Sequence, residues 1–573
     1  MQKDILLIFK THLDIGFTDF SKNVVERYIN EFIPGAIKLG YELKDSDTPF
    51  VWTVGSWLIW EALKSDDGTL EKAIRDGVIA WHALPFTTHT ELMNEKLFSY
   101  GLSISKELDR RFSKATVAAK MTDVPGHTIG MVPILQKNGV EFLHIGVNGA
   151  TPIPPVPPLF KWRCGNSEII VMYDGGYGTE TELDDFILCF GHTGDNCGPQ
   201  SADDIRKIYA ELRENHPGSR IIPSTLDDVA KRLRNSENLP VVDKEIGDTW
   251  IHGAGTDPKK VGRYRELMRK IKGGVNSDPD ISDSLLLVPE HTWGLCVKRY
   301  YPDIDCWTLK SFSKTEDDPD RIIMEKSWEE QREYLVSAEK IMGVSSTDYS
   351  VCEPDLEGFE KISDDPGLFV EFELFTRKDY ERYREKYIRP PMCSWKEWDF
   401  IKINLPEYPK EELRTWTTTA WQKGNKKIYL LEFPDYTKKI FGLPKVWVER
   451  EGENLEVYWI GKKANRLPHA LWLKFTGLSE KWQINKMGQW IDPENITGSP
   501  LITAFDRGVR NDEFEIESLD ACLAAPFGKR LLDYDLMPSG QDLYFNLYNN
   551  IWNTNFPMWY SDDTRFRFVI KKI

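Results

Sequence analysis

Short apolar runs alternate with helix-forming segments through the first 250 residues, and this alternation restricts the fold more than any other feature of the chain. The runs are Ile5 to Phe9, Phe50 to Val54, Val78 to Trp81, Thr116 to Ala119, Phe142 to Ile145, Ile169 to Met172 and Ile187 to Phe190. Strands that alternate with helices form parallel sheets, either closed or doubly wound. The sequence therefore predicts an α/β domain of the (β/α)7 barrel type over residues 1–255.

The rest of the chain predicts two further domains. Helical patterns with charged faces and apolar stripes, such as Lys259 to Lys272 and Ser327 to Met342, indicate a small helical bundle over residues 256–350. After about residue 360 the pattern changes to short strands rich in Trp, Tyr, Phe and Val, separated by Gly, Asn, Asp and Pro. This change predicts a C-terminal antiparallel β-sandwich-like domain over residues 351–573.

Composition narrows the classes of partner. A formal net charge of -17 argues against nucleic acid and anionic membrane, which both select basic surfaces. The eight cysteines contain no Cys-x-x-Cys pair, so we expect reduced thiols rather than a disulfide framework or a structural zinc knot. The many aromatic residues either offer faces on which sugar rings stack or fill β-sandwich cores.

The location of the protein is predicted from what the chain lacks. No window approaches the ~20 apolar residues of a membrane span. The first strand begins at Ile5, which leaves no room for a signal peptide. We therefore expect a cytoplasmic protein, although a secreted chain already trimmed of its leader would look the same. A homo-oligomer is left open.

His12 and Asp14 form a candidate metal-binding pair directly after the first apolar run. Side chains two residues apart in an extended chain project to the same face, so both can reach one ion. A neutral imidazole and a carboxylate are ligands that suit Zn²⁺, and the carboxyl ends of strands are where α/β barrels place their chemistry. On its own, the pair fits a surface turn or a helix N-cap equally well.

Three later segments supply the further ligands and carboxylates that a metal site needs. Asp123 follows the strand Thr116 to Ala119, and His127 lies where the next helix opens. His291 follows Glu290 in the helical region. Asp195 lies in a Gly-rich loop after the strand Ile187 to Phe190.

These segments resemble motifs of glycoside hydrolase family 38, the α-mannosidases. Residues 12–17, His-Leu-Asp-Ile-Gly-Phe, resemble the family's opening His-x-Asp-x-Gly-Trp. Residues 122–127 are similar to its Asp-x-Phe-Gly-His segment, residues 247–256 to its Gly-Glu-Leu and His-Arg-Gly-Thr segments, and residues 285–294 to its Leu-Leu-x-x-x-Phe-His-Asp segment. The four matches occur in the family's order and cover roughly residues 5–300.

The resemblance implies a metal centre and two catalytic carboxyls. Zn²⁺ would be held by His12, Asp14, Asp123 and His291, and Asp123 would also be the nucleophile of a retaining glycosidase. Such an enzyme needs a second carboxyl about 5 to 5.5 Å away as general acid. Asp195 is the candidate, with its pKa raised by burial, and the loop Gly194-Asp195-Asn196 keeps only one of the family's two carboxylates.

Other residues are candidates for contact with substrate. The resemblance implies a substrate-binding role for His252, and Trp293 offers an aromatic face next to the predicted metal ligand. His89 and Glu91 are either pocket residues or a cap for the helix that follows. His127 is expected to support the metal-binding carboxylate from behind. Phe17, Thr292 and the missing Arg depart from the family's pattern, and these departures concern the sugar more than the metal.

We therefore expect a zinc-dependent retaining α-glycoside hydrolase, α-mannosidase-like, that acts on an oligosaccharide or glycoside. Two alternatives stay open. One is a metal-dependent carbohydrate deacetylase, because related barrels also use an ion bound by Asp and His. The other is a catalytically silent glycan-binding protein, which Asn196 and the missing Arg would favour.

Overall fold

The computed structural model describes residues 3–271, 279–301, 305–344, 349–389, 402, 405–476, 481–499, 503–533 and 542–573. The chain divides into two compact units. The first comprises Met1–Thr90, Glu95–Glu245 and Glu290–Thr292, and the second comprises Glu91–Asn94, Ile246–Pro289 and Trp293–Ile573. The short segment around His291 thus belongs to the first unit, although helical sequence surrounds it. The division into three domains stays a prediction.

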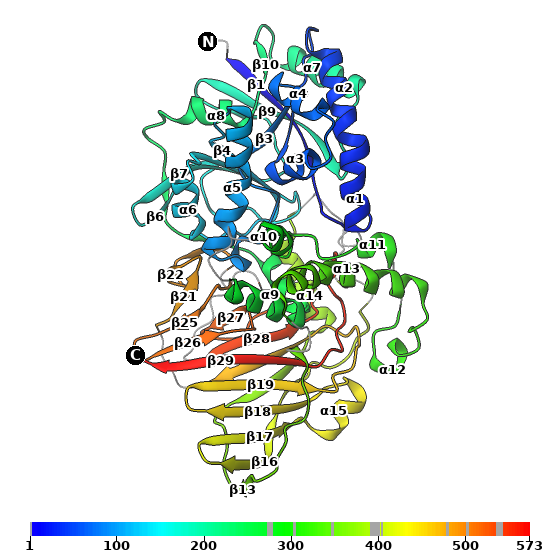
Figure 1. The fold of residues 1–573 in the computed structure, drawn as a ribbon, viewed down its shortest axis with the longest axis vertical. Coiled ribbons are helices and arrows are strands. Elements are labelled where there is room, and N and C mark those ends of the chain that lie inside the picture. Colours follow the sequence, from blue (N-terminus) through cyan, green and yellow to red (C-terminus); the bar gives the residue numbers. More distant parts are fainter. Residues whose placement is uncertain are drawn as a thin grey trace. The chain divides into compact units, whose positions relative to one another are not determined.

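The strands of the first unit form two mainly parallel sheets (Figure 1). One sheet has the order β3-β2-β1-β9-β8, with β10 also pairing with β1, and the other has the order β11-β6-β7-β5-β4. Their bounds are β1 (Asp4–His12), β2 (Trp52–Gly55), β3 (Ile79–His82), β4 (Ala118–Asp123), β5 (Phe142–Val147), β6 (Leu159–Cys164), β7 (Ser167–Asp174), β8 (Thr181–Glu182), β9 (Phe186–Asp195), β10 (Ile221–Pro223) and β11 (Val241–Val242). Only β6 with β7 and β8 with β9 pair antiparallel among these described strands.

The predicted mixed α/β architecture with parallel strands is confirmed, and each of the seven apolar runs corresponds to a strand. The described pairings fall into two sheets, which a backbone hydrogen bond from Ala83 to Ala118 (2.8 Å) joins beside β3 and β4. A closed seven-stranded barrel therefore stays a prediction.

Helices accompany the strands of the first unit, as Figure 1 shows for α3, α4 and α5. Their bounds are α1 (Ser21–Arg27), the π-helical turn η1 (Tyr28–Phe32), α2 (Ile33–Leu43), α3 (Ser56–Leu63), α4 (Thr69–Arg75), α5 (Glu95–Phe112), α6 (Met131–Lys137), α7 (Ala202–Asn215) and α8 (Leu226–Leu233). Helix α6 ends as predicted before Asn138 and Gly139, where Gly139 takes a φ of 75° that suits glycine.

The interior face of β1 changes from apolar to polar along the strand. Leu6 and Ile8 pack in a buried cluster with Phe142 of β5, Leu188 of β9 and side chains of α8. Two and four residues further on, the same face carries Lys10 and His12, which are also buried. The hydrophobic effect therefore stabilises the amino end of the strands, and the carboxyl end is left for polar chemistry.

The second unit combines helices with antiparallel sheets. Its helices are α9 (Pro258–Lys270), α10 (Pro279–Leu286), α11 (Val297–Tyr300), α12 (Leu309–Phe312), α13 (Pro319–Met342), α14 (Arg377–Tyr387) and α15 (Asp435–Ile440), and η3 (Thr249–Thr256) is a 3₁₀ helix. A buried bidentate ion pair between Arg263 of α9 and Glu339 of α13 (2.7 and 2.8 Å) links two of them. The predicted long helices are present, whereas α14 and α15 interrupt a region predicted to be all strand.

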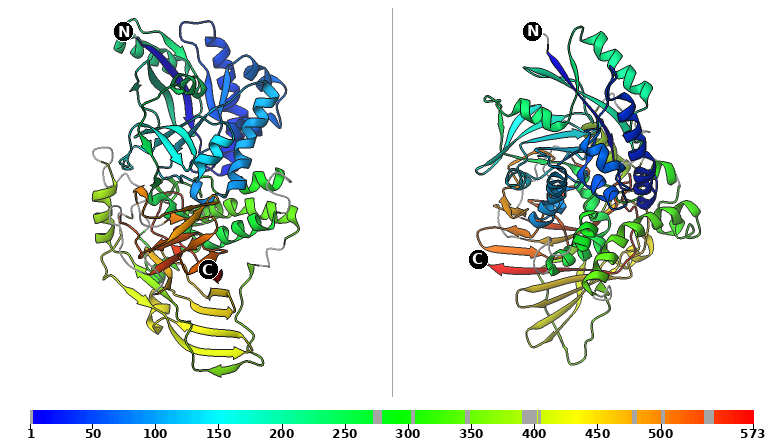
Figure 2. Two further views of the ribbon diagram at one scale, coloured as in Figure 1. Left: turned by 90° about the vertical axis from the view of Figure 1, so that its left-hand side faces the viewer. Right: turned by 45° about the horizontal axis from the view of Figure 1, so that its top comes forward.

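Ten strands of this unit form one sheet and six form another. The first has the order β13-β16-β17-β18-β19-β29-β26-β25-β21-β22 and the second β15-β14-β20-β28-β27-β24, and the described pairs in both are antiparallel. In Figure 2 the yellow strands of the first sheet lie side by side. The bounds are β12 (Glu245–Gly247), β13 (Glu360–Ile362), β14 (Phe369–Leu374), β15 (Glu412–Arg414), β16 (Trp416–Lys423), β17 (Lys426–Glu432), β18 (Lys445–Glu451), β19 (Asn454–Ile460), β20 (His469–Phe475), β21 (Gln483–Lys486), β22 (Gln489–Ile491), β23 (Ile496–Gly498), β24 (Thr503–Ala504), β25 (Gly508–Arg510), β26 (Phe514–Ser518), β27 (Leu523–Pro526), β28 (Leu543–Asn549) and β29 (Thr564–Lys572).

The described residues contain neither a disulfide bond nor a helix that could span a membrane. Their seven cysteines all carry free thiols. Among their helices, none combines the length and the apolar character that crossing a bilayer requires.

Candidate active site

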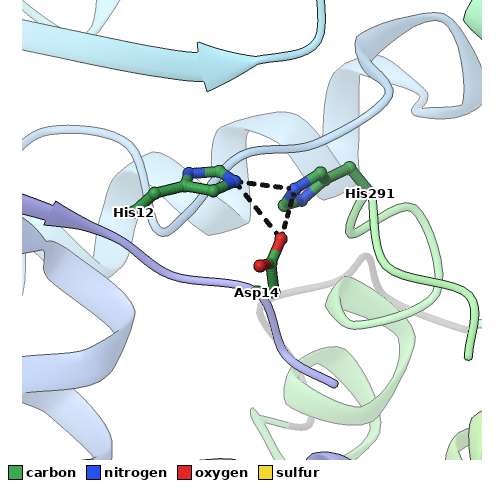
Figure 3. A group of neighbouring side chains, drawn as sticks. All are labelled: His12, Asp14 and His291. Atoms are coloured by element: carbon green, nitrogen blue, oxygen red, sulfur yellow. Dashed lines mark hydrogen bonds and ion pairs between the residues drawn. The ribbon is translucent and has the colours of Figure 1, made fainter. Parts of the chain in front are cut away.

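Three buried side chains of the first unit converge at the carboxyl end of β1 (Figure 3). The Nε2 atoms of His12 and His291 lie 3.1 Å apart. Both also face Oδ1 of Asp14, at 3.2 Å from His12 and 2.9 Å from His291. Two imidazole nitrogens and a carboxylate oxygen this close together require a proton or a cation between them.

The backbone around Thr88 brings His291 to this point. Thr88 and Glu290 form an antiparallel bridge, and the amide of His291 donates to the carbonyl of Thr87 at 3.4 Å. Residues some 200 positions apart are thus joined by main-chain bonds, which do not depend on side-chain identity.

Glu290 orients the imidazole of His291. Its Oε1 lies 2.6 Å from Nδ1 of His291, and its Oε2 accepts a hydrogen bond from the amide of Thr292 at 2.8 Å. An ionised carboxylate can only accept, so in the neutral form of His291 the proton is on Nδ1 and the lone pair of Nε2 faces the cluster. Carboxylate–histidine pairs of this kind typically support metal ligands.

Asp123 lies at the end of β4 with its carboxylate beside the cluster. Its Oδ2 is 3.8 Å from Nε2 of His291. Its Oδ1 accepts hydrogen bonds from Nδ2 of Asn148 (3.0 Å) and from the hydroxyl of Tyr177. The backbone φ of Asp123 is 84°, a left-handed conformation that is costly outside glycine. The two hydrogen bonds at Oδ1 leave Oδ2 directed at the cluster.

Asn196 holds the turn that carries Asp14. Its Oδ1 accepts the amide N–H of Asp14 at 3.0 Å, while its Nδ2 donates to the carbonyl of Gly16 at 3.1 Å and to Oγ1 of Thr18 at 2.9 Å. This set needs a side chain that both accepts and donates. A carboxylate at position 196 could not donate these bonds.

The donors fit a divalent zinc ion. Among the described residues, Oδ2 of Asp14 is buried without a hydrogen-bond partner, which is costly for a carboxylate. Imidazole nitrogens together with carboxylate oxygens are the ligands that zinc prefers. His12, Asp14 and His291 could therefore hold the ion, and Asp123 lies next to them.

The charges of the group are strongly coupled. Burial disfavours charge on His12 and on His291, yet the neighbouring Asp14 and Glu290 carboxylates keep both histidine pKa values above their ordinary range. Burial would raise the pKa of Asp14, but the two imidazoles lower it. Without an ion the site therefore binds protons, so a metal and protons compete for the same lone pairs.

Asp195 lies at the end of β9, where its backbone is in register with His12 of β1. Burial, and after it the charge of Asp14, raise the pKa of Asp195 to about 6. The charge of Asp123 acts in the same direction. A carboxyl with this pKa is protonated in part near neutral pH and can act as an acid.

The remaining candidates are divided between the two units. His89 and His127 lie buried in the first unit, where Nδ1 of His127 contacts Oγ1 of Thr90 (3.3 Å). Among the described residues His127 has no hydrogen bond to the ligand carboxylates, and its expected supporting role stays a prediction.

Glu91, His252 and Trp293 belong to the second unit. The Glu91 carboxylate accepts hydrogen bonds from Lys486 and from Thr503. His252 is buried, which lowers its pKa to about 3, and the Trp293 indole lies 3.8 Å from Nζ of Lys260. Contact of these three and of His89 with substrate stays a prediction.

Four residues of the site were not predicted from the sequence: Asn148, Tyr177, Glu290 as a partner of His291, and Asn196 as a support for Asp14. Two of them are direct neighbours of predicted residues, so adjacency to a ligand was the available signal. Asn148 and Tyr177 follow β5 and β7 and carry no spacing that marks them.

Comparisons with known proteins agree with the fold. A family described as a domain of unknown function (DUF5054) matches residues 254–351. No curated protein matches the sequence. An α-mannosidase from Enterococcus faecalis V583 is similar in structure, with a TM-score of 0.62 and 9% identity over 100% of this chain and 87% of that one. A glycosyl hydrolase family 38 protein from Enterococcus faecalis is similar with a TM-score of 0.58 and 9% identity, over 100% and 86%. The resemblance drawn from the four motifs is thus confirmed at the level of the fold, which is like that of glycoside hydrolase family 38.

Proposed function

We propose that this protein is a zinc-dependent retaining α-glycoside hydrolase of the α-mannosidase type. The observation that carries the proposal is the convergence of His12, Asp14 and His291 beside the Asp123 carboxylate, in a fold like that of family 38. The similar structures are those of a named α-mannosidase and a family 38 protein, and this supports the choice of glycosides as substrates.

Asp123 has the environment of a nucleophile. Asn148 and Tyr177 hold one of its oxygens, so the other is presented in a fixed direction. In the proposed reaction the Asp123 carboxylate attacks the anomeric carbon, the bond to the leaving oxygen breaks, and a glycosyl ester of Asp123 forms. Holding the attacking atom in place removes part of the entropic barrier. A bound zinc ion would supply positive charge to hydroxyls of the sugar.

Asp195 is proposed to donate the proton that the leaving oxygen needs. Its raised pKa keeps a protonated fraction near neutral pH. After the leaving group departs, the Asp195 carboxylate takes a proton from water as the water oxygen attacks the anomeric carbon, and the bond from that carbon to the Asp123 oxygen breaks and frees the carboxylate. The acid is thereby regenerated and the configuration is retained.

The metal is tested by zinc content. Purified wild type should carry about one zinc per chain, and His12→Ala and His291→Ala should carry far less. His216→Ala is a matched control, because this histidine pairs with Glu180 in another part of the unit. Stoichiometric zinc in all three variants, or none in wild type, would contradict the proposal.

The carboxylates are tested by substrates that differ in leaving group. Asp123→Asn should abolish turnover of every glycoside. Asp195→Asn should keep its zinc and lose ~10²- to 10⁴-fold on sugars with poor leaving groups, with a small loss on aryl glycosides, because general acid catalysis matters only where protonation is needed. Full activity in Asp123→Asn would exclude Asp123 as the nucleophile, and no turnover of any glycoside by wild type would leave the deacetylase and glycan-binding alternatives.

A further inference from the structure

A cavity of about 400 Å³ is lined entirely by residues of the second unit. Helix α9 contributes Tyr264 and Arg265, and the hairpin of β21 and β22 contributes Asn485 and Trp490. These two strands, with β25 and β26, end the ten-stranded sheet (Figure 1). The volume lies within the ~300–1,000 Å³ of small-molecule sites. The cavity is therefore large enough for a ligand and belongs to a different unit from the proposed metal ligands.

The hairpin fixes the positions of two lining side chains. Its turn residues, Met487 and Gly488, have φ values of 47° and 79°. Positive φ at both central residues is what a two-residue turn between twisted strands requires. Asn485 and Trp490 lie directly opposite each other in the hairpin, so their side chains project from the same face. An amide and an indole are thus held next to each other at the cavity.

The Asn485 side chain offers hydrogen bonds to a ligand. It lines the cavity and is only 5% exposed. Its backbone carbonyl accepts the amide N–H of Asp506 at 2.9 Å, whereas its side-chain amide makes no hydrogen bond to any residue that the structure describes. An amide side chain can donate two hydrogen bonds and accept two. Because a nearly buried amide without a partner is costly, polar groups of a ligand would be favoured beside it.

The Arg265 guanidinium supplies further donors in a fixed position. Its side chain is 8% exposed and lines the cavity. Three of its N–H groups donate to the backbone carbonyls of Phe505 (2.8 Å), Ser518 (2.7 Å) and Leu519 (3.3 Å). A guanidinium carries five N–H donors, so two are left for a ligand. The three bonds to the main chain keep the group at the edge of the cavity.

The Trp490 indole supplies a half-buried aromatic surface. The Arg510 guanidinium lies 4.1 Å from the ring centroid, and its Nε donates to Oε1 of Gln483 at 2.8 Å. Among the described residues no other ring or cation contacts this indole. An aromatic surface surrounded by planar polar groups suits a sugar, whose C–H groups stack on the ring while its hydroxyls reach the polar side chains.

The charges around the cavity favour a neutral ligand. Both signs of charge line it, in Arg265, Arg269, Arg507, Asp506 and Glu517. An anion would meet the two carboxylates, and a cation would meet the three guanidinium groups, so either would lose its hydration without a matching set of partners. A hydroxyl both donates and accepts, and it can therefore pair with each of these groups.

We propose that this cavity binds a neutral hexose unit, free or at the end of a glycan. The sugar ring lies against Trp490, and its hydroxyls bond to Asn485 and Arg265. The site is a carbohydrate-binding site in addition to the proposed active site. It does not rest on the proposed glycosidase activity, because its residues take no part in that reaction.

Calorimetric titration with the methyl glycosides of mannose, glucose and galactose tests the proposal. At least one of them should bind to wild type, and binding should persist after chelation, which removes sugar contacts with a metal in the first unit. Trp490→Ala should weaken this binding at least about tenfold. Trp416→Ala is the matched control, since it removes a tryptophan of β16 that is 50% exposed and does not line the cavity, and its affinity should equal that of wild type.

Asn485→Leu separates binding from structure and serves if Trp490→Ala fails to fold. Leucine is similar in size and removes the unpartnered amide, so the sugar-free variant should unfold at the wild-type temperature or above it. It should lose the rise of roughly 1 to 3 °C that a saturating hexoside gives to wild type. Unchanged hexoside affinity in either variant, no binding of the three hexosides to wild type, or loss of binding on chelation would each overturn the proposal.

Discussion

Asn196→Asp should weaken zinc binding, although it adds a carboxylate of the kind that zinc prefers. The Asn196 side chain accepts one hydrogen bond, from the amide of Asp14, and donates two, to the carbonyl of Gly16 and the hydroxyl of Thr18. An ionised Asp keeps the acceptor and loses both donors. It also turns a negative oxygen toward the carbonyl of Gly16 in a site that is 6% exposed.

The size of the effect follows from these bonds. A buried acceptor left without its donor costs about 1–3 kcal/mol, and the carbonyl of Gly16 is such an acceptor. Repulsion between the new carboxylate and that carbonyl adds to this, so we expect a loss of about 2–4 kcal/mol in the free energy of unfolding. Because the turn positions Asp14, zinc affinity should fall roughly 10- to 100-fold, as for other changes behind a metal ligand.

A competition titration against a chelator measures the zinc affinity, and thermal or denaturant unfolding measures the stability. Asn138→Asp is the matched control, since the Nδ2 of Asn138 donates to the carbonyl of Ile134 at 2.9 Å beside α6. This control should lose stability and keep its zinc affinity. Unchanged or tighter zinc binding in Asn196→Asp would refute the assignment of Asn196 as the support of the Asp14 turn.

Three further predictions concern the same site. Tyr177→Phe removes a donor to Oδ1 of Asp123 and should lower kcat about tenfold, because one such hydrogen bond contributes ~1.4 kcal/mol. The zinc content of this variant should be unchanged, and a wild-type kcat would exclude this role for Tyr177. Glu290→Gln should reduce zinc affinity 10- to 100-fold in the chelator titration, because the amide no longer fixes the proton on Nδ1 of His291; equal affinity would show that the carboxylate is not needed. For poor leaving groups, kcat/KM should fall as the pH rises through about 6, since Asp195 is protonated below its raised pKa and ionised above it; a pH–rate profile of Asp195→Asn should lack this limb, and its persistence would assign the limb to another group.

The strands of the first unit could be predicted because their apolar runs are buried on both faces. In β1, Ile5 to Phe9 are all buried, and such runs are visible without any knowledge of the partner strands. Strands β6, β8, β10 and β11 were not predicted, because they lack a continuous apolar run of this length. Strand β6 alternates between buried and partly exposed residues, β8 and β11 are two residues long, and β10 is three residues long. These segments are strands only because they pair with neighbouring strands, and that pairing cannot be seen in the sequence.

The candidate ligands could be predicted where the local backbone alone determines the positions of their side chains. His12 and Asp14 follow a strand at a spacing of two, so their convergence depends on few residues. The hydrogen bonds of Asn148 and Tyr177 to Asp123 instead depend on how β5 and β7 pair beside β4. The positive φ of Asp123 could not be predicted either, because an aspartate at the end of a strand usually has a negative φ.

Lys10 and Lys120 directly follow predicted apolar runs, but the hydrophobic pattern alone does not predict that these lysines are buried. Lys10 directly extends the run Ile5 to Phe9, and Lys120 extends Thr116 to Ala119. A lysine at the end of a buried strand usually marks the point where the strand reaches water. Here both strands continue past the lysine, to His12 and to Asp123. His12 and Asp123 are therefore buried, although they lie at the ends of their strands.

The proposed ligand set also explains which ion the site should select. Magnesium and calcium take shells of oxygen ligands, whereas the two imidazole nitrogens of His12 and His291 favour a zinc-like ion. Asp14 and Asp123 together carry two negative charges, which a divalent cation balances. Because an unbalanced charge is costly in a buried site, neutrality requires two carboxylates among the four proposed ligands. The negative charges of Asp14 and Asp123 also disfavour charge on a further carboxylate close to them, which agrees with a raised pKa at Asp195.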